Sequence, residues 1–414
     1  MKKKVNDIVV RDDLYPRMEM DIKKVGEYAE NIELLPPILI NQDNILIDGK
    51  HRLFAHKKCE LDEIEVIIEK TKSDDDIRLR AIETNATHGL QLSSTDKKSL
   101  AIRLYDLKNR QRLIKALSVS ESAFDKWVAN KASQLKEQQE KAIIDLYLHA
   151  EYTQQEIADK TGVTQPNIAQ IIKNCKGTVN YNFSDFEPFL YNIWNVPKIS
   201  NEQKHFGNFP IEFMENLLYY YTEPFDVVYD PFAGGGVTID ACKKWYRRFY
   251  VSDMNPAVER EGDVHNWKIQ DGLSDDLPSP DFVFLDPPYW KQAEGKYSKD
   301  KNDLGNMELE DFYNTLSIFI KALKNKMKAG RIALVIQPTQ WKNKNKEFED
   351  HIIKLIALIE KSGFKEEMRY VLPYSTQQYN PQQVEVAKKE KFCLNIVRDL
   401  VIFKKENGKN NVSH

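Results

Sequence analysis

Cysteine is scarce in this chain, and long apolar runs are missing. Of 414 residues only four are cysteines, and none of them stands in a C-x-x-C spacing. This pattern argues against a zinc site and against a disulfide framework. No run of 18 apolar residues occurs, and Met1–Lys4 leads into polar residues rather than an apolar signal core. We therefore expect no bound metal, no membrane contact and a cytoplasmic protein.

The net charge gives little indication of a partner. Charged residues make up 30% of the chain and hydrophobic residues 41%, with a net charge of −3, which is a globular balance with room for two or three domains. Affinity for duplex DNA comes largely from phosphate neutralisation, so this charge is unhelpful unless the domains differ. A local basic run comprises Lys108, Arg110, Arg112 and Lys115, while acids gather at residues 74–76. The run indicates either a DNA-facing surface or an ordinary solvated face.

Three segments differ in their periodicity. Residues 1–70 alternate short apolar strands with turns, which predicts a small α+β domain. Residues 71–177 have helical periodicity and predict an all-α region. Residues 178–414 alternate strands with helices, which predicts an α/β domain whose Rossmann-like, largely parallel sheet is covered by helices on both faces.

The first segment contains a glycine turn that suits a phosphate group. Two short strands, residues 36–41 and 44–48, flank a predicted hairpin turn and lead to Gly49. A helix then opens with Lys50-His51-Arg52, so that backbone N–H groups and positive side chains would face an anion. The alternative is a small module in which Arg52 forms a structural salt bridge.

This segment resembles the ParB/sulfiredoxin fold. The resemblance lies in residues 14–17, the strand at Pro37-Ile38, and residues 47–52. It implies a nucleoside triphosphate held at Gly49, Lys50, His51 and Arg52. Lys50 stands where sulfiredoxins carry a catalytic cysteine, which argues against reductase chemistry. ParB proteins carry Glu-Arg-Arg after the glycine, so binding and hydrolysis of CTP stay open.

Residues 154–171 read as a helix-turn-helix. Ala158 is small where two helices would cross, Gly162 supplies a left-handed turn residue, and Thr164 can cap the second helix. Ile168 and Ile171 would face inward. The second helix would present polar side chains to a DNA groove, in which Gln and Asn can pair with adenine edges. These candidate DNA-binding residues are Thr164, Gln165, Asn167, Gln170 and Lys173.

A weaker copy of this pattern occupies residues 113–127. Two such units resemble the helical DNA-binding region of ParB proteins, which implies double-stranded DNA as a partner. The alternative is a helical spacer that contacts protein only. Helix-turn-helix proteins often dimerise, so a homodimer stays open.

Carboxylates recur at the predicted strand ends of the third segment. The predicted strands are residues 227–230, 248–253, 267–271, 281–286 and 331–337, with a final pair near 368–372 and 399–404. Ligands of open parallel sheets bind beyond the carboxyl ends of the strands. Asp230, Asp253, Asp271 and Asp286 would all lie there, although each could instead cap a helix or bind a turn N–H.

The segment resembles the S-adenosylmethionine-dependent DNA methyltransferases that modify exocyclic amino groups. Residues 230–236 match motif I, residues 286–289 match motif IV, and residues 205–210 match motif X. Asp253 would accept hydrogen bonds from the cofactor ribose, and Asp271 would meet the cofactor adenine. The resemblance implies these cofactor-binding residues: Phe209, Pro210, Asp230, Pro231, Phe232, Ala233, Gly234, Gly236, Asp253, Met254, Asp271, Gly272 and Asp286.

The motif Asp286-Pro287-Pro288-Tyr289 implies a direct methyl transfer. An exocyclic amino nitrogen is a poor nucleophile until its two hydrogens are accepted, and Asp286 and the Pro287 carbonyl are the proposed acceptors. Tyr289 would stack on a base rotated out of the duplex. An Asp at the first position favours N6 of adenine, with N4 of cytosine as the alternative. No cysteine follows a proline, which disfavours C5-cytosine chemistry.

Two polar segments, residues 291–307 and 375–391, are candidate target-contacting loops. The leading hypothesis is a DNA adenine methyltransferase with a ParB-like module, of the kind found in phage or restriction-modification systems. One alternative is a non-enzymatic DNA-binding or partition factor. Another is a nuclease, for which the sequence offers no clear metal-carboxylate cluster.

Overall fold

The computed structural model describes residues 1–14, 20–88, 93–179, 186–196, 209–260, 262–291, 295, 298–340, 348–373 and 379–406. It contains two compact units, residues 1–140 and 141–414, and the boundary falls within helix α6. Of the sequence predictions, residues 15–17, His205–Asn208, Lys296, Gln377 and Gln378 lie outside the described residues. None of the described helices combines the length and apolar character needed to span a bilayer.

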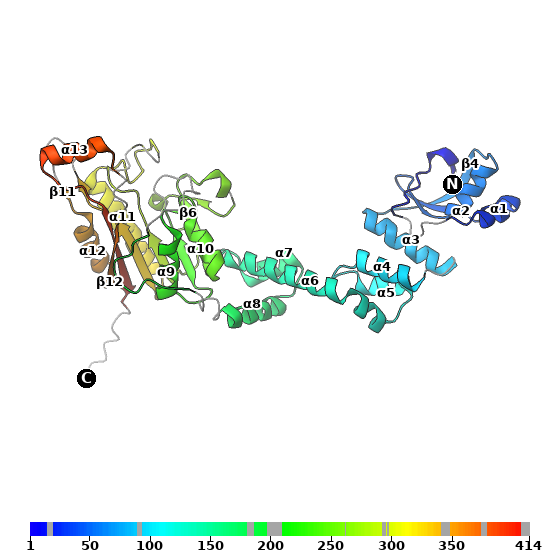
Figure 1. Ribbon diagram of the computed structural model, residues 1–414, viewed down its shortest axis with the longest axis horizontal. Coiled ribbons are helices and arrows are strands. Elements are labelled where there is room, and N and C mark those ends of the chain that lie inside the picture. The colour runs from blue at the N-terminus through cyan, green and yellow to red at the C-terminus, as the bar shows by residue number, and fades with distance from the viewer. Residues whose placement is uncertain are drawn as a thin grey trace. The chain divides into compact units, whose positions relative to one another are not determined.

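The first unit begins with a four-stranded sheet in the order β1-β4-β2-β3 (Figure 1). Its strands are β1 (Lys2–Lys4), β2 (Ile38–Asn41), β3 (Leu46–Asp48) and β4 (Glu63–Glu69). Strands β2 and β3 form the predicted antiparallel hairpin, and β2 pairs with β4 in parallel. Helices α1 (Ile22–Glu30) and α2 (Lys50–Lys58) accompany the sheet, and Leu53 of α2 is buried against Ile38, Ile40 and Val66.

Three helices and the first part of a fourth complete the first unit: α3 (Asp74–His88), α4 (Ser94–Leu104), α5 (Arg110–Leu117) and α6 (Glu121–Leu148), which continues into the second unit. Their own core includes Leu113, Leu117 and Phe124, which are almost fully buried. Ser118 adopts a left-handed conformation between α5 and α6, so the weaker helix-turn-helix copy does form two helices around a tight turn.

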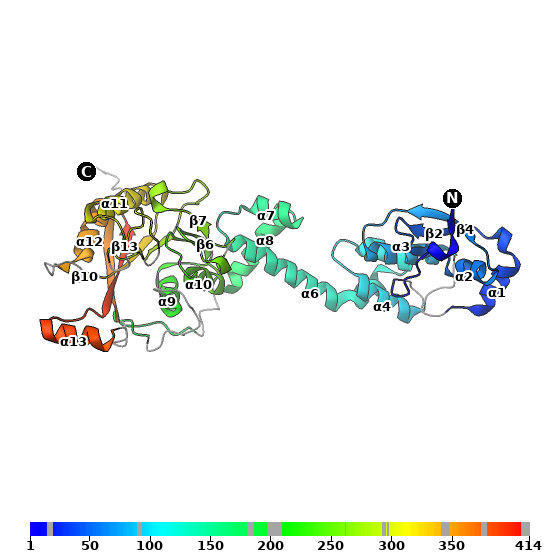
Figure 2. The same ribbon diagram turned by 90° about the horizontal axis from the view of Figure 1, so that it is seen from above.

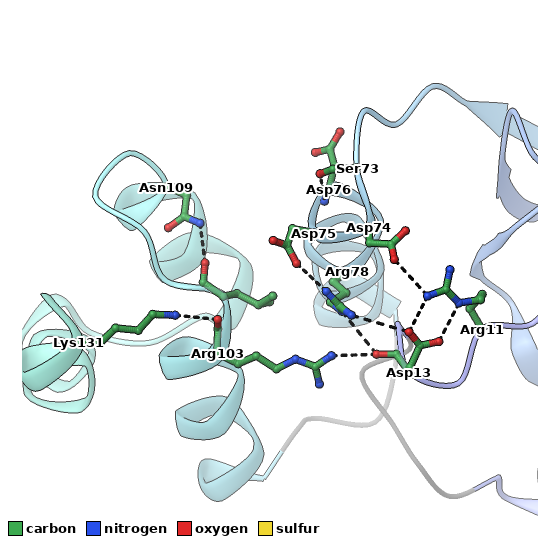
Figure 3. Close-up of polar contacts among 11 residues, drawn as sticks. Arg11, Asp13, Ser73, Asp74, Asp75, Asp76, Arg78, Arg103, Asn109 and Lys131 are labelled. Carbon is green, nitrogen blue, oxygen red and sulfur yellow. Dashed lines mark hydrogen bonds and ion pairs between the residues drawn. The ribbon is translucent and has the colours of Figure 1, made fainter. Parts of the chain in front are cut away.

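Charged side chains tie these helices to the strand region (Figure 3). Arg11 pairs with Asp13 at 2.7 Å and with Asp74 of α3 at 3.1 Å. Arg103 of α4 donates to the backbone carbonyl of Asp13 at 3.0 Å, and Arg78 of α3 pairs with Asp75 at 2.6 Å. The acidic run at residues 74–76 therefore serves packing within this unit.

The second unit contains a seven-stranded sheet in the order β12-β13-β9-β8-β5-β6-β7. The strands are β5 (Val227–Asp230), β6 (Arg248–Asp253), β7 (His265–Asn266), β8 (Phe282–Leu285), β9 (Arg331–Ile336), β12 (Phe364–Pro373) and β13 (Val397–Lys405). Strands β9, β8, β5, β6 and β7 run parallel, and β13 is antiparallel to both of its neighbours. A separate antiparallel pair is formed by β10 (Thr339–Gln340) and β11 (Phe348–Glu349).

Helices cover both faces of this sheet (Figure 1), and the side chains of its strands alternate between two cores. On β8, Phe282 and Phe284 join one core, and Val283 and Leu285 join the other. The first face is covered by α9 (Ile211–Tyr221) and α10 (Val237–Trp245), and the second by α11 (Leu309–Lys326) and α12 (His351–Lys361). Burial on both faces explains why the central strands read as short, continuous apolar runs, and the predicted Rossmann-like α/β class is confirmed.

Two sequence predictions in this unit are wrong. The predicted strand 267–271 is instead a 3-10 turn at Ile269–Asp271 after the two-residue β7. The indole N–H of Trp267 closes that turn by donating to the Gly272 carbonyl at 3.0 Å, and Gly272 has a positive φ of 86°. The predicted loop 375–391 contains helix α13 (Pro381–Glu390), which begins at a capping box between Asn380 and Gln383.

The helix-turn-helix lies in the second unit, next to strand β6 of the seven-stranded sheet (Figure 2). Helices α7 (Gln154–Thr161) and α8 (Gln165–Val179) meet at Gly162, which has the predicted left-handed conformation. Arg248 at the start of β6 donates to the carbonyls of Tyr147, Ala150 and Tyr152 at 2.9–3.1 Å. The backbone N–H of Ala150 also donates to the Phe249 carbonyl at 2.9 Å.

We predict that Arg248→Met loosens this attachment and leaves the sheet intact. Three partly buried carbonyls lose their donor, which costs on the order of 3 kcal/mol in total. Amide hydrogen exchange should accelerate at residues 147–161 and stay unchanged in β8 and β9. Arg369→Met is the matched control, since Arg369 pairs only with Glu366 on an exposed part of β12 among the described contacts. Equal exchange in both variants would contradict the prediction.

Candidate active site

Three predicted acids come together where neighbouring parallel strands end. Asp230 ends β5, Asp253 ends β6, and Asp286 follows β8 directly. Because β8 pairs with β5 and β5 pairs with β6, these carboxylates share the carboxyl edge of the sheet. The electrostatic field confirms their proximity, since the charges of Asp286 and Asp253 each raise the pKa of Asp230.

Asp230 organises the turn that follows its own strand. Its carboxylate accepts from the Thr238 hydroxyl at 2.5 Å and from the Phe232 N–H at 2.9 Å. The side chain is buried, and burial raises its pKa to about 7, although both hydrogen bonds oppose the shift. Both carboxylate oxygens of Asp230 are thus engaged within the protein, so it shapes the loop and the start of α10.

The glycine turn between β5 and α10 leaves open space beside the strand ends. Gly234 has φ +49°, and a Cβ added there would meet only the Phe232 carbonyl oxygen, at 3.9 Å. Gly236, with φ +82°, is constrained differently, because its Cβ would lie 2.9 Å from Nε of Arg260. Arg260 is held there by a bidentate pair with Asp240, at 2.9 and 2.6 Å. The conformation favours glycine at Gly234, and close packing against Arg260 adds to this preference at Gly236.

Asp253 links this turn to the next strand. Its Oδ2 accepts from the Gly234 N–H at 2.9 Å, and its Oδ1 accepts from the Asn255 N–H at 2.8 Å. The carboxylate is only partly buried, so lone pairs remain for hydroxyl donors of a ligand. An open glycine turn beside an oriented carboxylate fits S-adenosylmethionine, whose methionine part would lie over Gly234 and whose ribose would reach Asp253.

The Asp286–Tyr289 turn presents a carboxylate that is already hydrogen-bonded. The Tyr289 hydroxyl donates to Oδ1 of Asp286 at 2.9 Å, and Pro287 is buried. Burial raises the pKa of Asp286 to about 6, while the positive charge of Arg398 and the Tyr289 hydrogen bond lower it. Pro288 and Tyr289 are partly buried. The stacking of Tyr289 on a base stays a prediction.

Sequence reasoning missed Arg398, which lies near the start of the antiparallel strand β13. It is 4% exposed, and its guanidinium lies 5.4 Å from the ring centroid of Phe209. The Phe209 ring in turn contacts Phe284 of β8 at 4.9 Å between centroids. Arg398 and the motif X residue Phe209 therefore both lie at the Asp286 end of the sheet. Its sequence neighbours, Val397 and Asp399, give no local signal for this position.

The remaining cofactor candidates differ in burial and in their position relative to the strand ends. Pro231 and Ala233 are buried and Phe232 is partly buried in the turn itself, while Pro210 is buried and caps α9. Met254 follows Asp253 and is partly buried. Asp271 is exposed in the 3-10 turn beyond β7, and the neighbouring Gly272 carbonyl accepts from Trp267. Contact of Asp271 and Gly272 with a cofactor stays a prediction.

The candidate DNA-contacting residues on α8 all lie at the surface. Ile168 is fully buried and Ile171 partly buried, so the predicted inward face is correct. Two candidates already bond to neighbouring side chains, Gln165 to Gln154 at 2.9 Å and Gln170 to Asn174 at 2.7 Å. The exposed candidates are Thr164, Gln165, Asn167, Gln170 and Lys173.

The two arginines of the basic run before α6 form ion pairs within their own unit. Arg110 pairs with Glu121 at 3.0 Å and with Asp125 at 2.8 Å. Arg112 pairs with Asp76 and Glu83, both at 2.9 Å. Of the two readings of this run, the structure favours ion pairing on a protein surface over an open patch for phosphates.

The residues around the glycine turn of the first unit bond to neighbouring groups of the same unit. A Cβ on Gly49 would lie 2.6 Å from Cγ2 of Ile38, so packing alone requires glycine there. Arg52 donates to Asp48 at 2.7 Å and to the Pro37 carbonyl at 2.8 Å, which realises the structural alternative. Lys50 pairs with Asp12 at 2.5 Å, and His51 accepts from the Asp21 N–H at 3.2 Å. A phosphate at this turn stays a prediction.

Comparison with known families supports the methyltransferase resemblance. Residues 65–261 match the family model of the N6/N4 DNA methylases. The matched range contains β5 and β6, with Asp230 and Asp253, and it ends before Asp286. The resemblance predicted from the sequence is confirmed over this range, and the family name covers both N6 and N4 chemistry.

Individual proteins match this chain over a short segment or at low sequence identity. The transcriptional regulator NovG of Streptomyces niveus is 37% identical over 79 residues, 19% of this chain. The chain spans about a quarter of the length of this curated relative, 24%. The Caulobacter crescentus ParB complex with the parS site is 14% identical, with a TM-score of 0.26 over 31% of this chain and 70% of that chain. A Burkholderia thailandensis 1,6-didemethyltoxoflavin-N1-methyltransferase is also 14% identical, with a TM-score of 0.32 over 48% and 78%.

We predict that Tyr289→Phe moves the acidic limb of the kcat/KM–pH profile for methyl transfer to higher pH. The hydroxyl lowers the pKa of Asp286, so its removal raises that pKa above about 6. An acid with a raised pKa needs a higher pH to reach the same ionised fraction, and kcat/KM reports this group in the free enzyme. Tyr220→Phe, which removes a hydroxyl bonded to the Phe189 carbonyl, is the control. Identical acidic limbs in the wild type, Tyr289→Phe and Tyr220→Phe would refute the claim that the Tyr289 hydroxyl lowers the pKa of Asp286.

Proposed function

We propose that the protein is an S-adenosylmethionine-dependent DNA methyltransferase that modifies N6 of adenine. The observation that carries the proposal is the meeting of Asp286 with Asp253 and the open Gly234 turn at one edge of the sheet. One side of this edge suits the cofactor, and the other offers a carboxylate to an amino group. The family match over residues 65–261 supports a DNA methylase, without separating N6 from N4.

Asp286 would act as an acceptor, with no covalent step on the protein. An ionised carboxylate accepts one hydrogen of the target amino group, and the Pro287 carbonyl accepts the other, which localises the nitrogen lone pair. Bound S-adenosylmethionine supplies an electrophilic methyl group to that nitrogen. As positive charge develops there, Asp286 stabilises it and can take the departing proton. With a pKa near 6, Asp286 is largely ionised at neutral pH.

Tyr289 gives this acceptor a second state. Its hydroxyl occupies Oδ1 of Asp286, so an incoming amino group must replace that hydrogen bond. Rotation of the Tyr289 ring away from Asp286 would release the oxygen and leave the ring free to stack on an extruded base. The same movement would thus uncover the acceptor and hold the substrate.

The proposed substrate is double-stranded DNA, contacted by the exposed face of α8. Asn167 and Gln165 are residue types that can pair with both edge atoms of adenine in the major groove. Because Arg248 joins the helix-turn-helix to β6, the bases that α8 contacts would lie at a fixed offset from the methylated base. The N4-cytosine alternative uses the same acceptors and differs only in the fit of the base.

Methyl transfer tests the proposal directly. Wild-type protein should transfer labelled methyl groups to duplex DNA, and nucleoside mass spectrometry should find N6-methyldeoxyadenosine. Asp286→Asn keeps the side-chain shape and removes the charge, so transfer should fall by about 100-fold or more. S-adenosylmethionine binding, measured by calorimetry, should persist in this variant. Transfer by Asp286→Asn at the wild-type rate would remove Asp286 from the mechanism, and N4-methyldeoxycytidine would identify the alternative base.

Target choice tests the role of α8. In a host that expresses Asn167→Ala or Gln165→Ala, long-read sequencing should show a relaxed methylation site, because each lost base contact removes about 1–3 kcal/mol of discrimination. Gln155→Ala is the control, since Gln155 lies on α7 and bonds to Asp159. An unchanged site in both α8 variants would show that another element reads the sequence.

A further inference from the structure

A buried chain of polar side chains ends on the backbone directly after the catalytic turn. The Thr339 hydroxyl donates to the Trp290 carbonyl at 2.8 Å, and the same hydroxyl lies 2.8 Å from Nε2 of His351. Nδ1 of His351 lies 2.9 Å from the Tyr313 hydroxyl, which lies 2.7 Å from Oε1 of Glu349. These residues come from β10, β11, α11 and α12, four elements that are separate from the strands carrying the acids.

The central residues of this hydrogen-bonded chain lie in the protein interior. His351 is 0% exposed and Thr339 is 4% exposed. The His351 ring also contacts the rings of Trp290 at 5.9 Å and Phe312 at 5.6 Å between centroids. The His351 ring therefore packs against the Trp290 ring, and Thr339 connects His351 to the Trp290 carbonyl.

The single proton of a neutral imidazole can serve only one of the two hydroxyl oxygens that face His351. Burial lowers the pKa of His351 to about 4, so the imidazole is neutral at neutral pH and carries one proton. The charges of Glu349, Asp350 and Lys354 also act on it, and the α11 and β10 groups facing it are the Tyr313 and Thr339 hydroxyls. The Thr339 hydroxyl donates to the Trp290 carbonyl and the Tyr313 hydroxyl donates to Glu349, so each hydroxyl oxygen can accept from the imidazole.

The Nε2–H tautomer strengthens the contact with Trp290. Nε2–H would donate to the Thr339 oxygen, and the Thr339 hydroxyl donates to the Trp290 carbonyl, so the two hydrogen bonds polarise each other. The Nδ1–H tautomer would donate to the Tyr313 oxygen instead. The Tyr313 hydroxyl donates to Glu349, which already accepts from the Lys354 ammonium at 2.6 Å.

We propose that Thr339 and His351 are positioning residues that fix the Asp286–Tyr289 turn through the Trp290 carbonyl, with His351 as the neutral Nε2–H tautomer. The kinetic part of this inference rests on the proposed methyltransferase function. Trp290 is the residue after Tyr289, so a displacement of its carbonyl shifts Tyr289 and Asp286 directly. The cofactor side, at Gly234 and Asp253, lies on other strands and is independent of this chain.

Matched variants test the kinetic part. Thr339→Val keeps the side-chain shape and removes the hydroxyl, so kcat for methyl transfer should fall about 10- to 100-fold, as expected for a small misplacement of reacting groups. KM for S-adenosylmethionine should stay within about twofold of wild type, because the cofactor residues do not move. Thr339→Ser keeps the hydroxyl and should retain near-wild-type kcat. Equal kcat in the Val and Ser variants, with an active wild type, would overturn the positioning role and leave the proposed function intact.

A spectroscopic readout tests the tautomer without any activity. In full-length protein labelled with nitrogen-15 at histidine, the resonance that is absent from His351→Gln should show a neutral Nε2–H ring from pH 7 to about pH 5. His351→Gln places an amide donor near the position of Nε2 and should retain more kcat than His351→Asn, whose shorter amide cannot reach Thr339. A charged ring or an Nδ1–H tautomer at pH 7 would overturn the proposed tautomer of His351. If wild-type protein transferred no methyl group, the proposed function would fail and this measurement would still decide the tautomer.

Discussion

The second unit depends on the crowding of three carboxylates at the ends of β8, β5 and β6. Asp230 is buried between Asp286 and Asp253, and its pKa near 7 reflects burial first and their charges after it. Ionising this group opposes folding, so its stabilising contribution is greatest below the ordinary pKa and is lost as pH rises toward 7. The Thr238 hydroxyl and the Phe232 N–H offset part of that penalty and shape the glycine turn. A buried acid with a raised pKa beside two other acids is typical of a ligand site.

The charged residues of the two units are used differently. In the first unit the arginines of the basic run and the acids at residues 74–76 form ion pairs with neighbouring side chains of the same unit. Arg52, beside the Gly49 turn, pairs with Asp48. In the second unit the α8 candidates stay at the surface, on a helix pair that Arg248 joins to the sheet. The net charge of the whole chain is therefore a poor guide to DNA contact, because the proposed contacts are a few exposed polar side chains on α8.

Much of the active-site edge could be predicted from the sequence. Strands buried on both faces produce short apolar runs, so residues 227–230 and 248–253 were located correctly, with the acids at their ends. The 3-10 turn at Ile269–Asp271 was predicted as a strand, because the alternating Trp267 and Ile269 have the same local pattern as a strand at the edge of a sheet. The cap Asn380-Pro381 with Gln383 was an available signal for α13. Arg398 and the Thr339–His351 chain depend on contacts between distant segments, which no local pattern encodes.

The central claim is that a methyl donor and an extruded base meet above β5, β6 and β8. A crystal structure of the full-length chain with S-adenosylhomocysteine and duplex DNA tests it most directly. The account predicts the homocysteine part over Gly234, the ribose hydroxyls on Asp253, and the amino group of a flipped adenine within hydrogen-bond distance of Asp286. Density for the ligand at another place in the chain, or a target base held away from Asp286, would contradict it.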